Sequence, residues 1–175
     1  MKKINLTTPL KHEDLIKLSV GDRVYLSGII YTARDLAHKR FKKENHLPFN
    51  AKNQVIFYAG PTPGKGKKLI GSIGPTTSSR VDEFTPWVLE KGIKAFIGKG
   101  DRSPEVIAAL KKHKAIYFIS FGGVAALLSK YIVNASVVAY KELGPEAVYK
   151  LEVQNFPVIV AIDLKGNNIY KGALK

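Results

Sequence analysis

Three turns in the sequence combine glycine, hydroxyl and basic residues, a mixture that presents backbone N–H donors and positive charge to an anion. The richest spans residues 74–80, where Pro75 fixes a backbone angle, four consecutive residues carry hydroxyls and Arg80 adds a guanidinium. A cation at the start of the helix expected next opposes the helix dipole, which favours an anion in this turn. A plain hydroxyl-capped helix start remains the alternative.

The second turn, residues 98–103, places Lys99 and Arg102 beside the start of another expected helix. Its glycine spacing fits neither a phosphate loop nor a dinucleotide fingerprint, so we do not interpret it as a nucleotide site. An ordinary strand-to-helix turn with surface cations is the alternative. Asp101 and Ser103 belong to the same turn, and Ser103 followed by Pro104 is typical of a helix start.

The third turn begins at Ala33 and holds Arg34 and Asp35, with His38 one helical turn further on. Arg34 and His38 share a helix face because they are four residues apart. A solvated helix face with an Asp35–Lys39 pair is the alternative. Residues 61–66 are compatible with a loop that closes over a site, but a hairpin connection is the favoured interpretation. Gly122 and Gly123 suggest a further anion-binding helix start, which close backbone packing explains equally well.

The elements that position these turns follow from hydrophobic periodicity and turn residues. Strands are predicted at 23–31, 54–59, 93–97, 115–120, 136–140, 147–153 and 157–163. Helices are predicted at 11–18, 33–43, 81–91, 105–112 and 122–129. Alternation in the middle of the chain and strands near its ends predict a single α/β domain with a mixed sheet or two sheets.

Composition excludes several kinds of chemistry. The 175-residue chain has 28 Lys and Arg against 14 Asp and Glu, a net charge of +14, and no cysteine. It therefore has no disulfide, thiolate nucleophile, thiolate zinc site or iron–sulfur cluster of its own. Its four histidines are scattered, which argues against a local metal site.

The charge and the apolar runs limit the partners. The longest apolar runs, such as 115–121 and 158–162, are far shorter than the roughly 20 residues of a membrane span. The start has no apolar core of signal-peptide length, so we expect a soluble, cytoplasmic protein without a membrane partner. The aromatic residues lie mostly in apolar strands rather than among the basic residues, so we expect no nucleic-acid partner. The net charge alone leaves two other kinds of function open: a nucleic-acid-binding domain, and an anion-binding regulatory domain without catalysis.

Five segments in order carry a family resemblance: VGDRVYLSGIIYTARDLAHKRF, YAGPTPGKGKKLIGSIGPTTSSRVD, GIKAFIGKGDRS, FGGVAALLSKYI and ELGPEAVYKLEVQNFPVIVAIDLKGN. With them the sequence resembles the β subunit of two-subunit class I fumarate hydratases, which is equivalent to the C-terminal domain of the single-chain forms. The β subunit of L-tartrate dehydratase is a close relative and stays open as the alternative.

The resemblance implies a single swivelling β/β/α domain over residues 1–175. It implies a hydro-lyase subunit of the tricarboxylic acid cycle that interconverts malate with fumarate and water. The enzyme would be active only with a cysteine-bearing α subunit that holds a 4Fe-4S cluster, in an αβ unit that dimerises further. Carried over by position, Thr76 takes part in proton transfer, and three cations hold the substrate carboxylates: Arg34, Arg80 and Lys99. The supporting residues are Asp35, His38, Thr77, Asp101 and Arg102, and none is a metal ligand.

Overall fold

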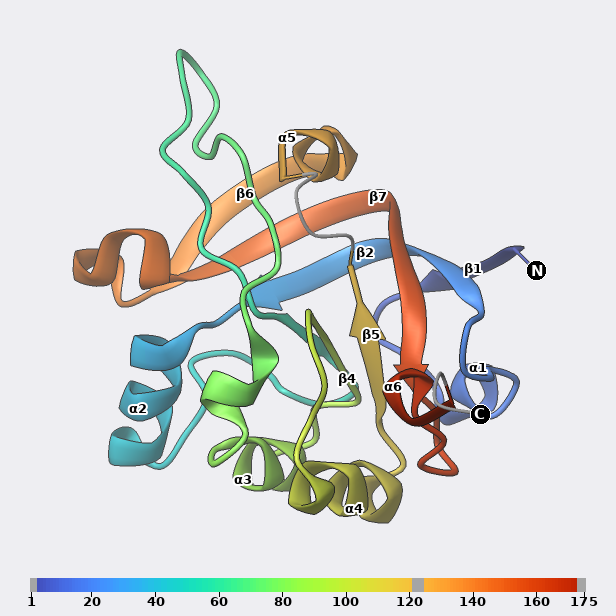
Figure 1. Ribbon diagram of the computed structural model, residues 1–175. Helices are drawn as coiled ribbons and strands as arrows, with labels where there is room; N and C mark the ends of the chain where they lie inside the picture. Colours follow the sequence, from blue (N-terminus) through green and yellow to red (C-terminus); the bar gives the residue numbers. More distant parts are fainter. Residues whose placement is uncertain (1–2, 121–124, 173–175) are drawn as a thin grey trace.

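The computed structural model describes residues 3–120 and 125–172 (Figure 1). The strands are β1 (Lys3–Thr7), β2 (Arg23–Thr32), β3 (Val55–Phe57), β4 (Ala95–Gly98), β5 (Ile116–Ile119), β6 (Ile132–Ala139) and β7 (Val148–Ile162). The α-helices are α1 (His12–Leu15), α2 (Asp35–Glu44), α3 (Thr85–Glu90), α4 (Pro104–His113), α5 (Ala125–Leu128) and α6 (Ile169–Gly172). Three 3₁₀ segments complete the order: η1 (Ser78–Val81), η2 (Ser129–Tyr131) and η3 (Lys141–Glu146).

The sheet closes on itself. Its strand order is β1-β2-β3-β4-β5-β7-β6, and β2 also pairs with β7, so five strands form a ring with β1 and β6 outside it. Strands β1 to β5 pair in parallel, whereas β7 runs antiparallel to β2, β5 and β6. The predicted α/β domain with a mixed sheet is therefore confirmed.

Alternation along the ring strands divides the core in two. Val55 and Phe57 of β3 point into a cluster inside the ring, and Ile56 between them packs in a second cluster on the helical side. Helices α2, α3 and α4 lie together on that side (Figure 1). The aromatic side chains Phe57, Phe96, Tyr117 and Phe118 on β3, β4 and β5 are fully buried, so these strand aromatics belong to the core.

Several predicted boundaries were wrong. The predicted helix 81–91 is instead the 3₁₀ turn η1 followed by α3, because Pro86 starts a new helix at its first turn. The predicted helix 11–18 shortens to α1. The strands predicted at 147–153 and 157–163 are one strand, β7, with an irregularity at Asn155, whose φ is 53°. Strand β1 has no counterpart in the prediction, because only Leu6 of its five residues is buried.

Within the described residues, no helix is both long and apolar enough to cross a membrane. The predicted helix at 122–129 is seen only from Ala125 onward, as α5 and the start of η2. The suggested anion site at Gly122 and Gly123 lies outside the described residues.

Candidate active site

The carboxyl ends of three parallel strands bring the predicted turns to one edge of the ring. Arg34 follows β2, Gly60 follows β3 and Lys99 follows β4. These strands are neighbours in the sheet, in the order β2-β3-β4. In open α/β sheets this edge is where ligands bind, because loops and helix starts converge there. The ring keeps that arrangement on its parallel side.

Thr76 is fixed on the end of β3 by two hydrogen bonds to one acceptor. Its backbone N–H donates to the Tyr58 carbonyl at 2.7 Å, and its hydroxyl donates to the same oxygen at 3.0 Å. Pro75, just before it, forms an antiparallel bridge with Ala59. The half-buried Thr76 hydroxyl therefore has a defined position, with its remaining lone pairs available to a ligand.

The turn that holds Thr76 also lies directly beside the Lys99 turn. Thr77 and Lys99 form a parallel bridge, and the Ser78 N–H donates to the Lys99 carbonyl at 3.0 Å. The Thr77 and Lys99 side chains are exposed. The structure thus places two of the three predicted turns next to each other, with the hydroxyl of Thr76 and the ammonium of Lys99 on adjoining strand ends.

Arg34 reaches the same edge by packing over Gly60. A Cβ at Gly60 would lie 2.7 Å from the Pro145 carbonyl oxygen and 2.9 Å from Arg34 Nη1, so only glycine fits there. Arg34 Nη2 lies 3.4 Å from Glu146 Oε1, and both side chains are mostly buried. Glu146 Oε2 also accepts a hydrogen bond from the Leu36 N–H at 2.8 Å, at the start of α2.

Glu146 is a site residue that sequence reasoning missed. It lies more than a hundred positions from Arg34, and its only signal was its place in the ELGPEAV segment of the resemblance. Its carboxylate holds the helix start with one oxygen and the Arg34 guanidinium with the other. Arg34 therefore has a preset orientation before any ligand arrives, with its buried Nε still unpartnered.

Arg80 is exposed and belongs to η1 rather than to the start of a long helix. Arg80 therefore does not oppose the dipole of a long helix, as the sequence had predicted, since η1 is a single turn. The described residues include no ion-pair partner for Arg80, and it lies two residues after the Ser78 that joins the Lys99 turn. Its charge is available at the same edge.

Asp35 opens α2 on the Arg34 side of this edge, in that helix's first turn.

His38 lies beneath the site instead of on its surface. It is fully buried, and its Nδ1–H donates to the Arg34 carbonyl at 2.8 Å, since a carbonyl can only accept. Burial lowers the pKa of His38 from 6.5 to about 4, an effect that outweighs the opposing influence of the hydrogen bond to Arg34. His38 is therefore neutral at pH 7, and it packs between the rings of Phe41, Tyr58 and Phe84.

This buried imidazole predicts a pH dependence of stability. Between pH 6.5 and about 4 the unfolded chain binds a proton on His38 that the folded chain does not. The free energy of unfolding is therefore highest above pH 6.5 and decreases as the pH falls through this window. The loss attributable to this residue is about 3 kcal/mol at most. Unfolding by urea at several pH values measures it. His38→Phe is expected to reduce the slope by about one proton, while His46→Phe, at an exposed histidine, keeps it; parallel curves for wild type and His38→Phe would contradict the assignment.

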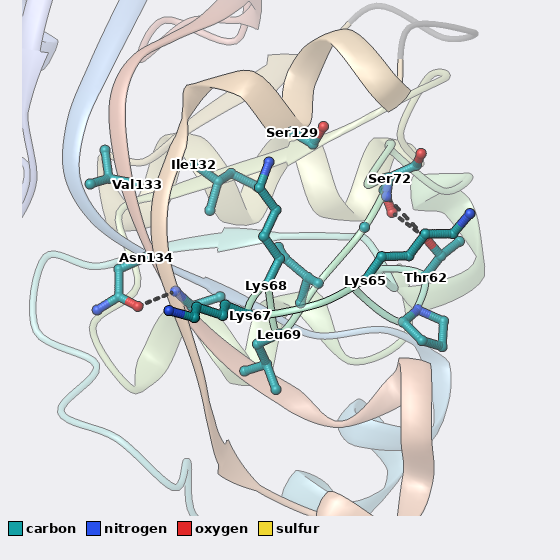
Figure 2. A pocket seen from close by; sticks show the side chains of 14 residues that line it. Thr62, Lys65, Lys67, Lys68, Leu69, Ser72, Ser129, Ile132, Val133 and Asn134 are labelled. Carbon is teal, nitrogen blue, oxygen red and sulfur yellow. Dashed lines mark hydrogen bonds between the residues drawn. The ribbon is translucent and has the colours of Figure 1, made fainter.

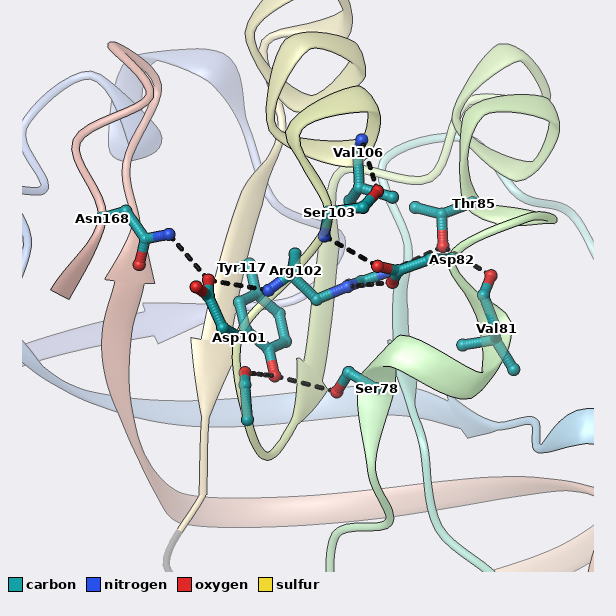
Figure 3. Close-up of polar contacts among 11 residues, drawn as sticks. Ser78, Val81, Asp82, Thr85, Asp101, Arg102, Ser103, Val106, Tyr117 and Asn168 are labelled. Carbon is teal, nitrogen blue, oxygen red and sulfur yellow. Dashed lines mark hydrogen bonds and ion pairs between the residues drawn. The ribbon is translucent and has the colours of Figure 1, made fainter. Parts of the chain in front are cut away.

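Arg102 points into the core rather than toward the edge (Figure 3). Its Nε donates to Asp82 Oδ1 at 2.6 Å, and its Nη2 donates to the Thr85 hydroxyl at 2.7 Å. The guanidinium also lies 5.3 Å from the centre of the Tyr58 ring and 4.9 Å from that of Tyr117. Burial disfavours the charged guanidinium, but these neighbours more than offset it and raise the pKa of Arg102. We assign Arg102 to the scaffold under the site.

Asp101 ties the second turn to the end of the chain. Its Oδ1 accepts from the Arg102 N–H at 2.7 Å and from Asn168 Nδ2 at 2.7 Å. Asp82 accepts the Ser103 N–H at 2.8 Å in addition to Arg102. The turn predicted to cap a helix does so, since the Ser103 hydroxyl accepts from the Val106 N–H at 3.3 Å.

Tyr117 joins the two turns from below. Its hydroxyl shares a hydrogen bond of 2.8 Å with Ser78 Oγ and donates to the Gly100 carbonyl at 2.9 Å (Figure 3). Ser78 sits so close over Gly98 that a Cβ there would overlap its hydroxyl. Burial raises the pKa of the Tyr117 hydroxyl, so it stays neutral and bridges the segments that carry Thr76 and Lys99.

We expect Tyr117→Phe to lower the free energy of unfolding by about 1–3 kcal/mol, because it leaves the Ser78 hydroxyl and the Gly100 carbonyl without this partner. Tyr58→Phe is the matched control. The Tyr58 hydroxyl is equally buried but has no hydrogen-bond partner of ordinary geometry among the described residues. Its removal should therefore cost much less in urea unfolding. Equal losses for the two variants would show that the Tyr117 bridge does not hold the turns.

The chain has no residues suited to an iron–sulfur cluster. It contains no cysteine, and the described residues include no group of three histidine, aspartate or glutamate side chains that would bind a metal. What this edge offers instead is a set of cations and a fixed hydroxyl. Such a set can bind carboxylates and support proton transfer.

Comparison with known proteins agrees with the resemblance in the sequence. Residues 1–173 match the family described as Fumarase C-terminus. The chain is 39% identical over 97% of its length to the L(+)-tartrate dehydratase subunit beta of Escherichia coli K12, covering 87% of that subunit. It is 38% identical over 98% of its length to Fumarate hydratase 2 of Leishmania major and 38% over 97% to the anaerobic class I fumarate hydratase of Escherichia coli K12. It spans 32% of each of those two proteins. The chain belongs to the fumarase C-terminus family.

Proposed function

We propose that this chain is the β subunit of a hydro-lyase that interconverts malate with fumarate and water, acting as a single domain over residues 1–175. The observation that supports the proposal most is the convergence of Arg34, Thr76 and Lys99 on adjoining strand ends. Relatives named fumarate hydratase and tartrate dehydratase subunit beta support the same reaction class. The proposed location is the cytoplasm.

In this proposal the cations bind the substrate dicarboxylate. Lys99 and Arg80 are exposed, and Arg34 is oriented by Glu146. Removing water from malate takes a proton from the carbon adjacent to the one that bears the leaving hydroxyl, and negative charge then builds on the carboxylate attached to the deprotonated carbon. Fixed cations stabilise that charge more as it develops than in the ground state.

Thr76 is the proposed proton-transfer residue. The Thr76 hydroxyl donates its proton in a hydrogen bond to the Tyr58 carbonyl, which leaves the lone pairs of the hydroxyl oxygen for the ligand. A threonine hydroxyl is a weak base, so it needs a stronger partner, and we propose a carboxylate from the other subunit. Thr77 and Asp35 would line the same edge, while His38, Asp101 and Arg102 would keep it in shape.

The partner is proposed to be a cysteine-bearing α subunit. A 4Fe-4S cluster held there would supply a Lewis acid for the leaving hydroxyl, chemistry that the cysteine-free β chain has no ligands to provide. The assembly is proposed to be an αβ unit that dimerises further. The term subunit beta in the relatives' names supports a second kind of chain.

L-tartrate dehydratase is the second candidate activity. It is favoured by coverage, because the chain corresponds to 87% of a separate tartrate dehydratase β subunit but to 32% of single-chain fumarate hydratases. The two activities need the same cations and differ in the extra hydroxyl of tartrate.

Anaerobic co-expression with the cysteine-bearing subunit tests the proposal. Assays with malate, fumarate and tartrate should show activity only when both chains are present. Turnover of tartrate alone would select the second candidate. Absence of hydro-lyase activity in a folded, cluster-loaded complex, together with steeply salt-dependent binding of oligonucleotides, would replace the proposal with a nucleic-acid-binding function.

A further inference from the structure

Strand β6 is an open edge of the sheet. It pairs with β7 on one side, and no described strand pairs with its other side. Its eight residues, IVNASVVA, include no charge and no proline, and several of their side chains are exposed. Proteins normally protect such an edge with charges, proline, β-bulges or a covering element, because its free N–H and C=O groups invite another strand. The pairing of β6 with β7 is irregular at Val133 and at Val138, but residues 134–137 between them pair in regular register.

Two hollows flank this edge and meet at Leu69 and Ala135. One, of about 530 Å³, lies between β6 and the segment 62–72, and Figure 2 shows the side chains of both walls. The other, of about 570 Å³, follows residues 135–141. Figure 1 shows the segment around residue 65 projecting beside β6. None of the proposed catalytic or substrate-binding residues lines either hollow.

Exposed apolar side chains collect here. Val133 is 62% exposed and Val138 38%, both on β6, and Leu69, which lines both hollows, is 50% exposed. These are three of the seven large apolar side chains that the described residues expose. A cluster of this kind around an open strand edge is typical of an interaction site.

Positive charge surrounds the apolar centre. Lys65, Lys67 and Lys68 rim the first hollow, and Lys130 and Lys141 lie just beyond the two ends of β6. A second copy of this chain fits poorly, because antiparallel pairing centred on β6 sets Lys130 of one copy opposite Lys141 of the other. The surface instead suits a partner that carries acidic residues around apolar anchors.

The edge is also continuous with the candidate site. Strand β6 leads directly into η3, and η3 ends at Glu146, which contacts Arg34. Gly60, over which Arg34 packs, precedes the segment that forms the other wall of the first hollow. Both walls of the first hollow are therefore joined through the chain to residues that contact Arg34, so a partner bound at Arg34 has this edge connected to its binding site.

We propose that the cysteine-bearing subunit docks on this edge by adding an extended segment with apolar and acidic residues to β6. This inference rests on the proposed function, since it takes its partner from there. Main-chain hydrogen bonds to β6 supply affinity, the hollows take alternate side chains, and the lysines select acidic residues. The binding surface consists of β6, Leu69 and the five lysines named above.

Association of the two purified subunits, measured at several salt concentrations, tests the docking surface. Val133→Asp and Val138→Asp are expected to weaken binding at least tenfold. Each places a negative charge at a position that becomes buried in the interface, opposite a partner segment that is itself acidic. Ile16→Asp is the control, since Ile16 is 58% exposed and lies after α1, far along the chain from β6. Lys67→Glu with Lys68→Glu should weaken binding and flatten its salt dependence, unlike Lys111→Glu with Lys112→Glu on α4. Circular dichroism checks that each variant folds.

The outcomes separate the two proposals. If the wild-type chains associate and the β6 and lysine variants bind equally well, the docking surface is refuted and the proposed function stands. If the folded wild-type chains do not associate, the proposed function fails and the docking proposal fails with it. If the chain alone forms a dimer that Val133→Asp disrupts, a second copy occupies the edge and the partner assignment is overturned.

Discussion

Replacing Thr76 with valine is expected to lower kcat of the assembled enzyme by about 10²–10⁴-fold, the usual contribution of a positioned proton-transfer group. KM should change little, because in the proposed mechanism the cations, and not this hydroxyl, hold the carboxylates. The fold should survive, since the Tyr58 carbonyl keeps the hydrogen bond from the Thr76 N–H when the hydroxyl is lost. Steady-state kinetics with malate and fumarate give both constants.

Four further variants make this test specific. Thr76→Ser keeps a hydroxyl and should recover much of kcat. Ser79→Ala removes a neighbouring exposed hydroxyl and should leave both constants near the wild-type values. Lys99→Ala or Arg80→Ala should instead lower kcat and raise KM together, because they remove charge that binds both ground state and transition state. An unchanged kcat for Thr76→Val would remove this residue from the mechanism.

Replacing Arg102 with methionine is expected to destabilise the chain by about 3–5 kcal/mol, because it leaves the mostly buried Asp82 carboxylate without its ion-pair partner. Thr85 loses a hydrogen bond in the same change. Such a loss is a large part of the 5–15 kcal/mol by which domains are usually stable. Chemical denaturation followed by circular dichroism measures the free energy of unfolding.

The controls separate pairing from simple loss of charge. Arg80→Met removes an exposed arginine and should leave stability nearly unchanged. Arg102→Lys should rescue little, because an ammonium cannot reproduce the two guanidinium bonds to Asp82 and Thr85. Adding Asp82→Asn to Arg102→Met should recover part of the loss by removing the unpaired charge. A loss below about 1 kcal/mol for Arg102→Met would contradict a structural role for the pair.

The candidate edge was accessible from the sequence because turn chemistry and strand order are local signals. Gly, hydroxyl and basic residues predicted the turns of Arg34, Thr76 and Lys99. Parallel pairing sets the Arg34 and Lys99 turns at the ends of strands on either side of β3. Hydrogen bonds to the Tyr58 carbonyl place Thr76 on the end of β3 between them. The helix start at Ser103 was equally local, with its capping hydroxyl and following proline.

Burial and long-range pairing were not accessible in this way. Arg102 and Lys99 look alike in the sequence, yet the Arg102 guanidinium is buried against Asp82 and the Lys99 side chain is exposed. The difference depends on a carboxylate that lies twenty residues before Arg102. Glu146 meets Arg34 only after the whole sheet forms. Strand β7 crosses polar residues and Pro157 without ending, since its neighbours on both sides hold it in place.

The closed ring has a consequence for the order of biosynthesis. Strand β2 is made well before its partner β7, which occupies residues 148–162, so the ring cannot close until the segment between them has been synthesised. Contacts between segments this distant in sequence are entropically costly and slow to form. Until then β2 and β5 lack a neighbour, and the nascent chain carries unprotected strand edges. Late closure of the ring therefore prolongs the time in which these edges can pair with other chains.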